Sequence, residues 1–143
     1  MAIWFGNPTI DDVRSGSVGL LSSHLGIEFT EWGDDFLRAT MPVEPRTRQP
    51  MGYLHGGASL VLAETLGSVA ANYVVDSTKF RCLGQEINAN HLRPVMDGIV
   101  IGTARPVHLG SRSQVWGIEI RDPRERLVCI SRLTVAVVEW HPK

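Results

Sequence analysis

One glutamate in this sequence stands among apolar residues, at a place where a carboxylate could do chemistry. Glu64 lies in the largely apolar run from Gly57 to Val74, directly after Ala63. A carboxylate in such a setting is costly to desolvate, so it needs partners or must shift toward its neutral form. Groups perturbed in this way concentrate at functional sites, where carboxylates serve as nucleophiles or general bases. A glutamate on a solvated strip of a helix is the alternative interpretation.

Two further features lie at helical spacing from Glu64. Ser68 follows by four residues, so on a helix its hydroxyl can hydrogen-bond the carboxylate or a water that the carboxylate activates. The triplet His55-Gly56-Gly57 opens the helical run, and glycines there allow a ligand to approach the backbone. The free N–H groups of a helix start can stabilise an oxyanion. A small residue for close packing and an ordinary glycine loop are the alternatives.

Two polar segments could bind phosphate. The segment 88–94 ends a predicted strand, and 108–112 forms a predicted turn between two strands. Arg93 and Arg112, with His91 and Ser111, would offer several hydrogen-bond donors to phosphate oxygens. An ordinary solvated surface is the alternative.

The composition narrows the class of protein. The 143 residues are 43% hydrophobic and 20% charged, which is typical of one globular domain spanning 1–143. The net charge of -1 leaves no basic footprint for nucleic acid. No apolar run approaches the roughly 20 residues of a membrane-spanning helix, and the N-terminus lacks a secretory signal. We therefore expect a cytoplasmic protein without membrane or nucleic-acid partners.

The residue types also argue against metal and cofactor chemistry. Cys82 and Cys129 form no Cys-x-x-Cys motif, so we expect buried thiols. The five histidines show no metal-ligand spacing, and we expect neither a metal nor a cofactor. The sequence also contains no Gly-x-Ser-x-Gly elbow, no Gly-x-x-x-x-Gly-Lys loop and no Gly-x-Gly-x-x-Gly fingerprint.

Hydrophobic periodicity predicts an α+β fold with one long helix. The run 57–74 is apolar nearly all round, as a helix buried on every side would be. Alternation and turn signals predict antiparallel strands around it, and proline breaks the loop 43–52. One curved sheet wrapped around one helix leaves open edges, so we expect at least a dimer. The predicted strands are 26–31, 37–43, 83–92, 98–107, 113–121 and 126–138, and a short helix capped by Thr9 covers 9–15.

Several motifs together resemble a known family. They are similar to the hotdog-fold acyl-CoA thioesterases of the phenylacetate-degradation type. Within this family they resemble the branch that contains the 1,4-dihydroxy-2-naphthoyl-CoA thioesterase of menaquinone biosynthesis and the proofreading thioesterase of enterobactin synthesis. The likeness runs from about residue 25 to the last strand and leaves out the N-terminal segment, 76–81 and 140–143, so the acyl preference stays open. The motifs are 46–57 (RTRQPMGYLHGG), 62–68 (LAETLGS), 86–94 (EINANHLRP), 108–116 (HLGSRSQVW) and 131–134 (SRLT).

The resemblance implies the hotdog fold, hydrolysis of an acyl-CoA and a role for each matching residue. Glu64 is the nucleophile or general base, and Ser68 helps to position the attacking water. Gln49 and His55 orient the thioester carbonyl, and the Gly56 N–H polarises it. Coenzyme A would contact Gly84, His91, Leu92, Arg93, His108, Leu109, Gly110, Ser111 and Arg112.

The resemblance also implies a homo-oligomer, a dimer or a tetramer of dimeric units. Its active sites would be shared, with Gln49 and His55 facing Glu64 and Ser68 of the neighbouring subunit. The substrate we expect is an aromatic acyl-CoA of the hydroxybenzoyl or dihydroxynaphthoyl type. Three alternatives remain: a proofreading thioesterase on misacylated aryl carrier protein, a hotdog dehydratase or hydratase, and a non-catalytic acyl-CoA binding module.

Overall fold

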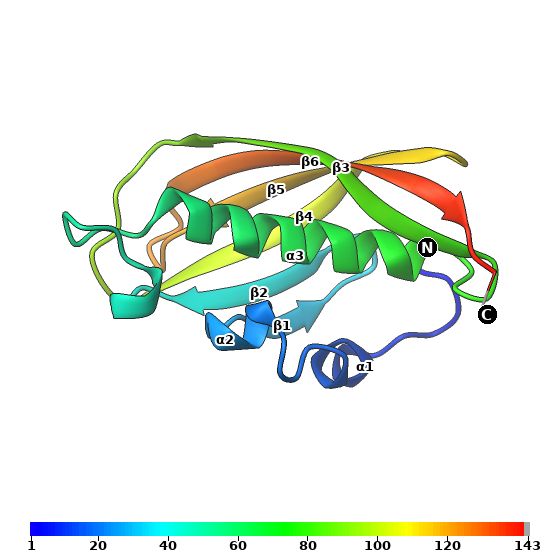
Figure 1. Ribbon diagram of the computed structural model, residues 1–143, viewed down its shortest axis with the longest axis horizontal. Helices are drawn as coiled ribbons and strands as arrows, with labels where there is room; N and C mark the ends of the chain where they lie inside the picture. Colours follow the sequence, from blue (N-terminus) through cyan, green and yellow to red (C-terminus); the bar gives the residue numbers. More distant parts are fainter. Residues whose placement is uncertain (142–143) are drawn as a thin grey trace.

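The computed structural model describes residues 1–141, so the last two residues of the 140–143 tail lie outside the described part. One long helix lies across the concave face of a six-stranded antiparallel sheet, and two short helices of the N-terminal segment lie beside the first two strands (Figure 1). This arrangement confirms the predicted α+β hotdog fold. The elements are α1 (Ile10–Ser15), α2 (Leu21–His24), β1 (Glu28–Trp32), β2 (Leu37–Pro42), a 3₁₀ turn (Pro45–Thr47), α3 (Gly56–Val74), β3 (Phe80–His91), β4 (Ile99–Leu109), β5 (Ser113–Arg121) and β6 (Leu127–Glu139).

The order of the strands decides which loops lie near one another. The sheet runs β1-β2-β4-β5-β6-β3, and every neighbouring pair is antiparallel. Strand β3 therefore pairs with β6, which comes last in the chain, and β3 forms one edge of the sheet. Its pairing with β6 shifts register between Gly84 and Glu86, so β3 carries a bulge at this point.

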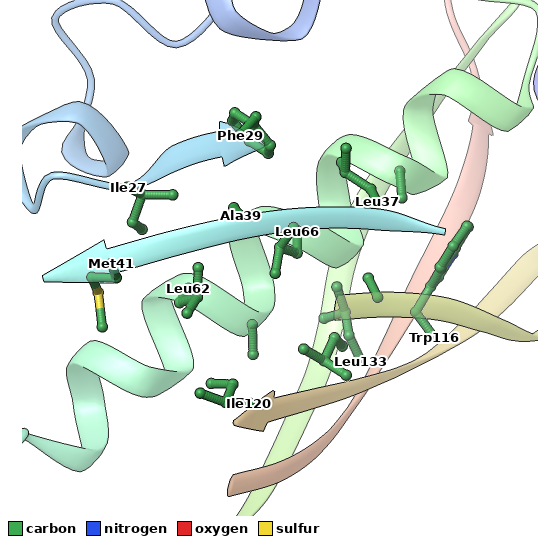
Figure 2. Close-up of a cluster of buried hydrophobic side chains, with 14 of the residues drawn as sticks. Ile27, Phe29, Leu37, Ala39, Met41, Leu62, Leu66, Trp116, Ile120 and Leu133 are labelled. Atoms are coloured by element: carbon green, nitrogen blue, oxygen red, sulfur yellow. The ribbon is translucent and has the colours of Figure 1, made fainter. Parts of the chain in front are cut away.

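The core lies between α3 and the concave face of the sheet. In Figure 2, Leu62 and Leu66 of α3 lie among side chains of the central strands, such as Met41, Ile120 and Leu133. Gly102 lets the helix lie this close to β4, because a Cβ there would come within 2.6 Å of Leu66 Cδ1. The residues of α3 that are buried are Ala58, Ser59, Leu62, Ala63, Leu66, Gly67, Ala70 and Ala71.

The prediction that this helix is buried on all sides is wrong for the single chain. Leu60, Val61 and Val69 are only half-buried, and Glu64 is exposed. A helix on a sheet can bury only the face that it turns to the sheet, so the apolar residues on its other face stay partly exposed in the single chain.

The N-terminal segment packs beside α3 and β1. The predicted short helix is confirmed: Thr9 caps α1, and the Asp12 carboxylate accepts a hydrogen bond from the Thr9 N–H in return. Trp4 donates to the Gly33 carbonyl at 2.7 Å and lies 4.4 Å from Trp32 between ring centroids. These contacts hold the segment against the body of the domain.

Most of the predicted loop 43–52 is irregular, but it contains the short 3₁₀ turn already named. The Thr47 hydroxyl at its end is buried and donates to the Pro42 carbonyl at 2.7 Å. Both cysteines are buried free thiols, as predicted. No helix within residues 1–141 has the length and apolarity needed to cross a membrane.

Candidate active site

The first candidate group is the start of α3. His55 is the N-cap residue, and its Nδ1 accepts a hydrogen bond from the Gly57 N–H at 2.8 Å. Because Nδ1 is the acceptor, a neutral imidazole carries its proton on Nε2 and can donate it outward from this exposed side chain. Within the described residues, the Gly56 N–H has no hydrogen-bond acceptor. The helix start therefore offers two donors to a ligand.

A tight turn places Gln49 beside this helix start. The Gln49 N–H donates to the Tyr53 carbonyl at 2.8 Å, and Gly52 takes a positive φ of 87° to close the turn. The Gln49 side-chain oxygen accepts a hydrogen bond from the Met51 N–H. With its oxygen engaged in this way, the Gln49 amide presents its NH₂ group as a donor.

Strand β3 ends against the same helix start. A Cβ on Gly56 would lie 2.8 Å from His91 Nε2, so only glycine leaves room for the His91 ring at this place. Gln49, Gly56 and His91 line one pocket of about 330 Å³. The other lining residues are Tyr53, Leu54, Ser59, Leu92, Arg93, Pro94 and Val128. The structure thus brings together two of the predicted carbonyl-binding residues, Gln49 and Gly56, with His91, Leu92 and Arg93.

Glu64 lies elsewhere on α3, next to the bulge of β3. A Cβ on Gly84 would lie 2.8 Å from Glu64 Oε1, so the carboxylate rests against the backbone of Gly84. The family resemblance predicts that Gly84 contacts coenzyme A, and in the fold this glycine lies beside the Glu64 carboxylate. A bulge next to a reactive group is a common way to aim or accommodate it.

The desolvation expected for Glu64 is not provided by the single chain, in which this residue is exposed. Ser68 lies one turn further along α3 and is half-buried. His55 precedes Glu64 by nine residues, which is about 13 Å along the helix axis. One chain therefore does not bring His55 and Gln49 together with Glu64 and Ser68.

The predicted coenzyme A contacts are also divided. His91 pairs with Cys129 of β6, whereas the turn 109–112 precedes Ser113, which pairs with Ala136 of the same strand. Seven residues of β6 separate these levels, or about 23 Å. Arg93 and the turn with Arg112 lie at opposite ends of the sheet, so a single chain does not bring these predicted coenzyme A contacts together.

The turn itself is shaped by two of the predicted residues. A Cβ on Gly110 would come within 2.6 Å of His108 Nε2, so the imidazole folds over the glycine. The Gly110 N–H donates to the Ser113 carbonyl at 2.9 Å, while Ser111 and Arg112 remain exposed. Their side chains are available to a ligand at this end of the sheet.

Asn72 is a residue whose importance the sequence did not reveal. Its amide nitrogen donates to the Cys82 carbonyl at 3.0 Å and its oxygen accepts from the Cys82 N–H at 2.9 Å. The same nitrogen also donates to the Ser68 carbonyl at 2.9 Å. Asn72 thus ties β3 to α3 two residues before Gly84, and so holds the strand beside the Glu64 carboxylate. An asparagine in a helix is common, so its sequence context gave no signal.

The thiols lie outside this chemistry. Burial raises the pKa of Cys82 to about 11 and raises the pKa of Cys129 as well. Both therefore stay protonated and unreactive at neutral pH. Among residues 1–141, no three His, Cys, Asp or Glu side chains come together in a way that could hold a metal ion.

The chain is similar in sequence to known thioesterases. Residues 51–129 match the model of the thioesterase superfamily. The chain is 50% identical to the 1,4-dihydroxy-2-naphthoyl-CoA hydrolase of Escherichia coli, over 95% of this chain and 99% of that protein. It is 51% identical to the proofreading thioesterase EntH of Cronobacter turicensis, over 95% of this chain and 98% of that protein.

Solved structures agree with these relatives. A variant of a thioesterase from Pseudomonas aeruginosa superposes with a TM-score of 0.95 at 42% identity, covering 97% of this chain and all of that one. A thioesterase from Haemophilus influenzae superposes with a TM-score of 0.92 at 44% identity, covering 96% of this chain and 95% of that one. Nearly the whole chain, including most of its N-terminal segment, superposes on these structures.

Proposed function

The chain belongs to the thioesterase superfamily, and from this premise we propose that it hydrolyses an aromatic acyl-CoA to the free acid and coenzyme A. Enzymes in this family cleave thioester bonds, so we no longer favour a non-catalytic binding module or a dehydratase or hydratase. The observation that carries the proposal is the set of donors at the start of α3. Gly56 and Gln49 line one pocket, and His55 is the cap residue directly before Gly56, so the Gly56 N–H, the Gln49 NH₂ group and the His55 Nε2–H could receive a thioester carbonyl.

The proposed site is completed by a second copy of the chain. Within one chain about 13 Å of helix separates His55 from Glu64. A two-fold arrangement with antiparallel α3 helices would set these donors opposite Glu64 and Ser68 of the neighbouring subunit. It would also cover the exposed side of α3 and the open edge of β3, where Leu83 is 59% exposed.

In this arrangement each group has a distinct task. Donors on one subunit hold the carbonyl and stabilise the charge that develops on its oxygen. Glu64 of the other subunit either attacks the carbonyl carbon and expels the coenzyme A thiolate, giving a mixed anhydride that water then cleaves, or removes a proton from a water that attacks the carbonyl carbon and expels the thiolate. Ser68 would orient that water. Single turnover in ¹⁸O-labelled water separates the routes, because only the anhydride route leaves label in Glu64.

Coenzyme A would bind at the rim of the proposed site. Arg93 and Arg112 carry planar groups suited to phosphate oxygens. Because one chain holds them at opposite ends of the sheet, we propose that the nucleotide contacts residues of more than one subunit.

The acyl group and its carrier are the finer parts of the proposal. The naphthoyl-CoA hydrolase relative supports an aromatic group on coenzyme A and a place in menaquinone biosynthesis. The EntH relative is equally similar and supports an aryl group misloaded on a carrier protein. Kinetics on dihydroxynaphthoyl-CoA, hydroxybenzoyl-CoA, hexanoyl-CoA and an aroylated carrier protein would decide. We expect kcat/KM to be highest on the aroyl-CoA esters, and a preference for hexanoyl-CoA would contradict the proposal.

Sharing of the site has its own test. The His55→Ala and Glu64→Gln proteins should each be nearly inactive as pure oligomers. Mixed under conditions that exchange subunits, they should regain activity, because one site of a mixed dimer then receives both intact halves. If the mixture stays as inactive as its components while mass spectrometry shows mixed oligomers, the two groups act within one chain.

A further inference from the structure

We propose that Arg48 is a positioning residue for the reaction. Its guanidinium joins the hairpin that carries Gln49 to the segment after β3, and so holds the Gln49 amide where the thioester carbonyl would bind. The inference rests on the proposed function, in which Gln49 is one of the carbonyl donors. It gives a role to a side chain that is not itself part of the proposed site.

The hairpin 48–54 is held together mainly by its own hydrogen bonds. Arg48 and Leu54 form an isolated antiparallel bridge at its base. Within the described residues, the hydrogen bonds made between these two positions all stay inside the hairpin. The Gln49 side-chain oxygen accepts from the Met51 N–H in this way. The direction of the Gln49 NH₂ group therefore follows the hairpin as a whole.

Two hydrogen bonds attach the base of this hairpin to the segment 95–98. The Leu54 N–H donates to the Val95 carbonyl at 2.7 Å, and Arg48 Nε donates to the Met96 carbonyl at 3.0 Å. Leu54 also packs against the core, so its side of the base is held by backbone and side chain together. On the opposite side of the base, the attachment to this segment is the Arg48 guanidinium.

The contacts of Arg48 suit this task. The residue is half-buried, and in the part of the chain that the structure describes it forms no ion pair with a carboxylate. Its partners are backbone carbonyls: besides Met96, its second terminal nitrogen lies 3.5 Å from the Val43 carbonyl, a longer and weaker contact. A planar guanidinium with several N–H donors can serve two carbonyls of different segments at once.

Arg48 lies behind the proposed carbonyl site and does not line it. The pocket of about 330 Å³ has Gln49 on one wall and 91–94 on the other, and Arg48 is absent from the described residues that line it. The segment 95–98 directly continues the second wall. The hydrogen bonds of the hairpin base to this segment therefore set the distance between the two walls, and Arg48 acts on the carbonyl through Gln49.

The first test is thiol release by Arg48→Ala. Thr47 still holds the preceding residue, since its hydroxyl donates to the Pro42 carbonyl at 2.7 Å. The Gln49 amide should therefore move by less than the roughly 1 Å that costs about 100-fold in rate. We expect kcat on an aroyl-CoA to fall about 5- to 30-fold, with KM changed by less than about threefold.

A truncated substrate separates positioning from nucleotide binding. The pantetheine thioester meets the same carbonyl donors, so Arg48→Ala should lower its kcat by the same factor. A rise in KM confined to the coenzyme A ester would show that Arg48 binds the nucleotide, and this result would overturn the proposal.

Arg46→Ala is the matched control, because it removes the same charge from the same loop. Arg46 donates to the His24 carbonyl at 2.6 Å and pairs with Glu44, neither of which belongs to the hairpin. This variant should keep kcat within about twofold of the parent. A loss as large as that of Arg48→Ala would show that removing either charge slows the reaction, and the hydrogen bonds of Arg48 would lose their assigned role.

A double-mutant cycle shows whether Arg48 acts through Gln49. Adding Arg48→Ala to Gln49→Ala should change kcat by less than about twofold, because the group that Arg48 positions is already gone. A further loss as large as that seen in the parent would reveal a separate role of Arg48, in the fold or in the chemistry, and would overturn the proposal.

A spectroscopic experiment keeps this inference separable from the proposed function. The chain has three glutamines, so ¹⁵N-glutamine labelling reports on Gln49 beside two references: Gln85, which is exposed, and Gln114, which is buried and accepts from Trp116. In the ligand-free parent, the order parameter of the Gln49 NH₂ group should resemble that of Gln114, and in Arg48→Ala it should fall toward that of Gln85. An unchanged order parameter would overturn the positioning role, even if the enzyme hydrolyses every ester offered. A fall in order, in a protein whose parent hydrolyses no ester, would end the proposed reaction and leave the hold of Arg48 on Gln49 established.

Discussion

Replacing Gly84 by alanine should separate the position of the Glu64 carboxylate from the stability of the fold. The nearest atom to the added methyl group would be Glu64 Oε1 at 2.8 Å, and the next, Glu64 Cδ and Leu133 Cδ1, lie at 3.9 Å. The only close contact is therefore with the end of one side chain. The φ of Gly84 is not positive, so alanine can adopt the same backbone conformation.

The size of the effect follows from this geometry. Ordinary contact begins at 3.4 Å, so the carboxylate oxygen must retreat by at least about 0.6 Å. A misplacement of about 1 Å can cost roughly 100-fold in rate, so we expect kcat to fall about 10- to 100-fold. Stability should not fall, because replacing glycine at a compatible position removes freedom from the unfolded chain and contributes about 0.4–1 kcal/mol.

The assay is thiol release from an aroyl-CoA, measured beside urea unfolding. Gly117→Ala is the matched control, because its added methyl group would meet Val107 Cγ2 at 3.4 Å, far from Glu64 in the chain. It should keep the parental kcat. A Gly84→Ala protein with unchanged kcat would refute the claim that Glu64 must rest against this backbone, and a large loss of stability would show that the glycine serves the fold instead.

Three further outcomes are expected. Arg93→Ala combined with Arg112→Ala should raise KM about 10- to 100-fold and leave kcat nearly unchanged, since the nucleotide is remote from the thioester. A truncated pantetheine thioester should be unaffected, and equal losses on both substrates would contradict this placement. Asn72→Ala should lower the free energy of unfolding in urea by about 2–3 kcal/mol, because it removes two hydrogen bonds between α3 and β3 and one within α3. A change below about 0.5 kcal/mol would contradict the role of Asn72 in holding β3 to α3. Burial raises the pKa of Cys82 from about 9 in the unfolded chain to about 11, so its contribution to stability is complete below pH 9 and is lost as the pH rises toward 11. Cys82→Ser should therefore reduce the loss of unfolding free energy over this alkaline range. An unchanged dependence of unfolding free energy on pH would contradict this reasoning.

The elements of this fold were largely predictable from the chain. The strand 113–121 and the end of α3 at Val74 were predicted at their observed residues, because alternation and full apolar periodicity are local signals. Strand β3 begins at Phe80, three residues before its predicted start at Leu83. Its pairing with β6 brings together parts far apart in the sequence and could not be predicted from periodicity.

The sequence predicts which residues form the candidate site, but it does not predict how one chain arranges them. Gln49, His55 and Gly56 gather at the start of α3, as their closeness in sequence suggests. The exposure of Glu64 could not be predicted, since apolar residues on α3 give the same pattern whether the sheet or another subunit covers them. The separation of Arg93 from Arg112 depends on strand order, and the contact of Gly84 with Glu64 depends on a bulge.

The most direct test of the account is the rate of thiol release by Glu64→Gln, compared with that of the parent on the same aroyl-CoA. Glutamine keeps the size of the side chain but can neither attack as a carboxylate nor accept the proton. We expect kcat to fall by more than about 10³-fold, whereas loss of a proton-transfer role alone costs roughly 10²–10⁴-fold. The circular dichroism spectrum and the binding of a non-hydrolysable thioether analogue should be unchanged. A folded Glu64→Gln protein that hydrolyses the ester at a rate within a factor of about two of the parent rate would contradict the assignment of Glu64, because loss of an essential base should cost far more.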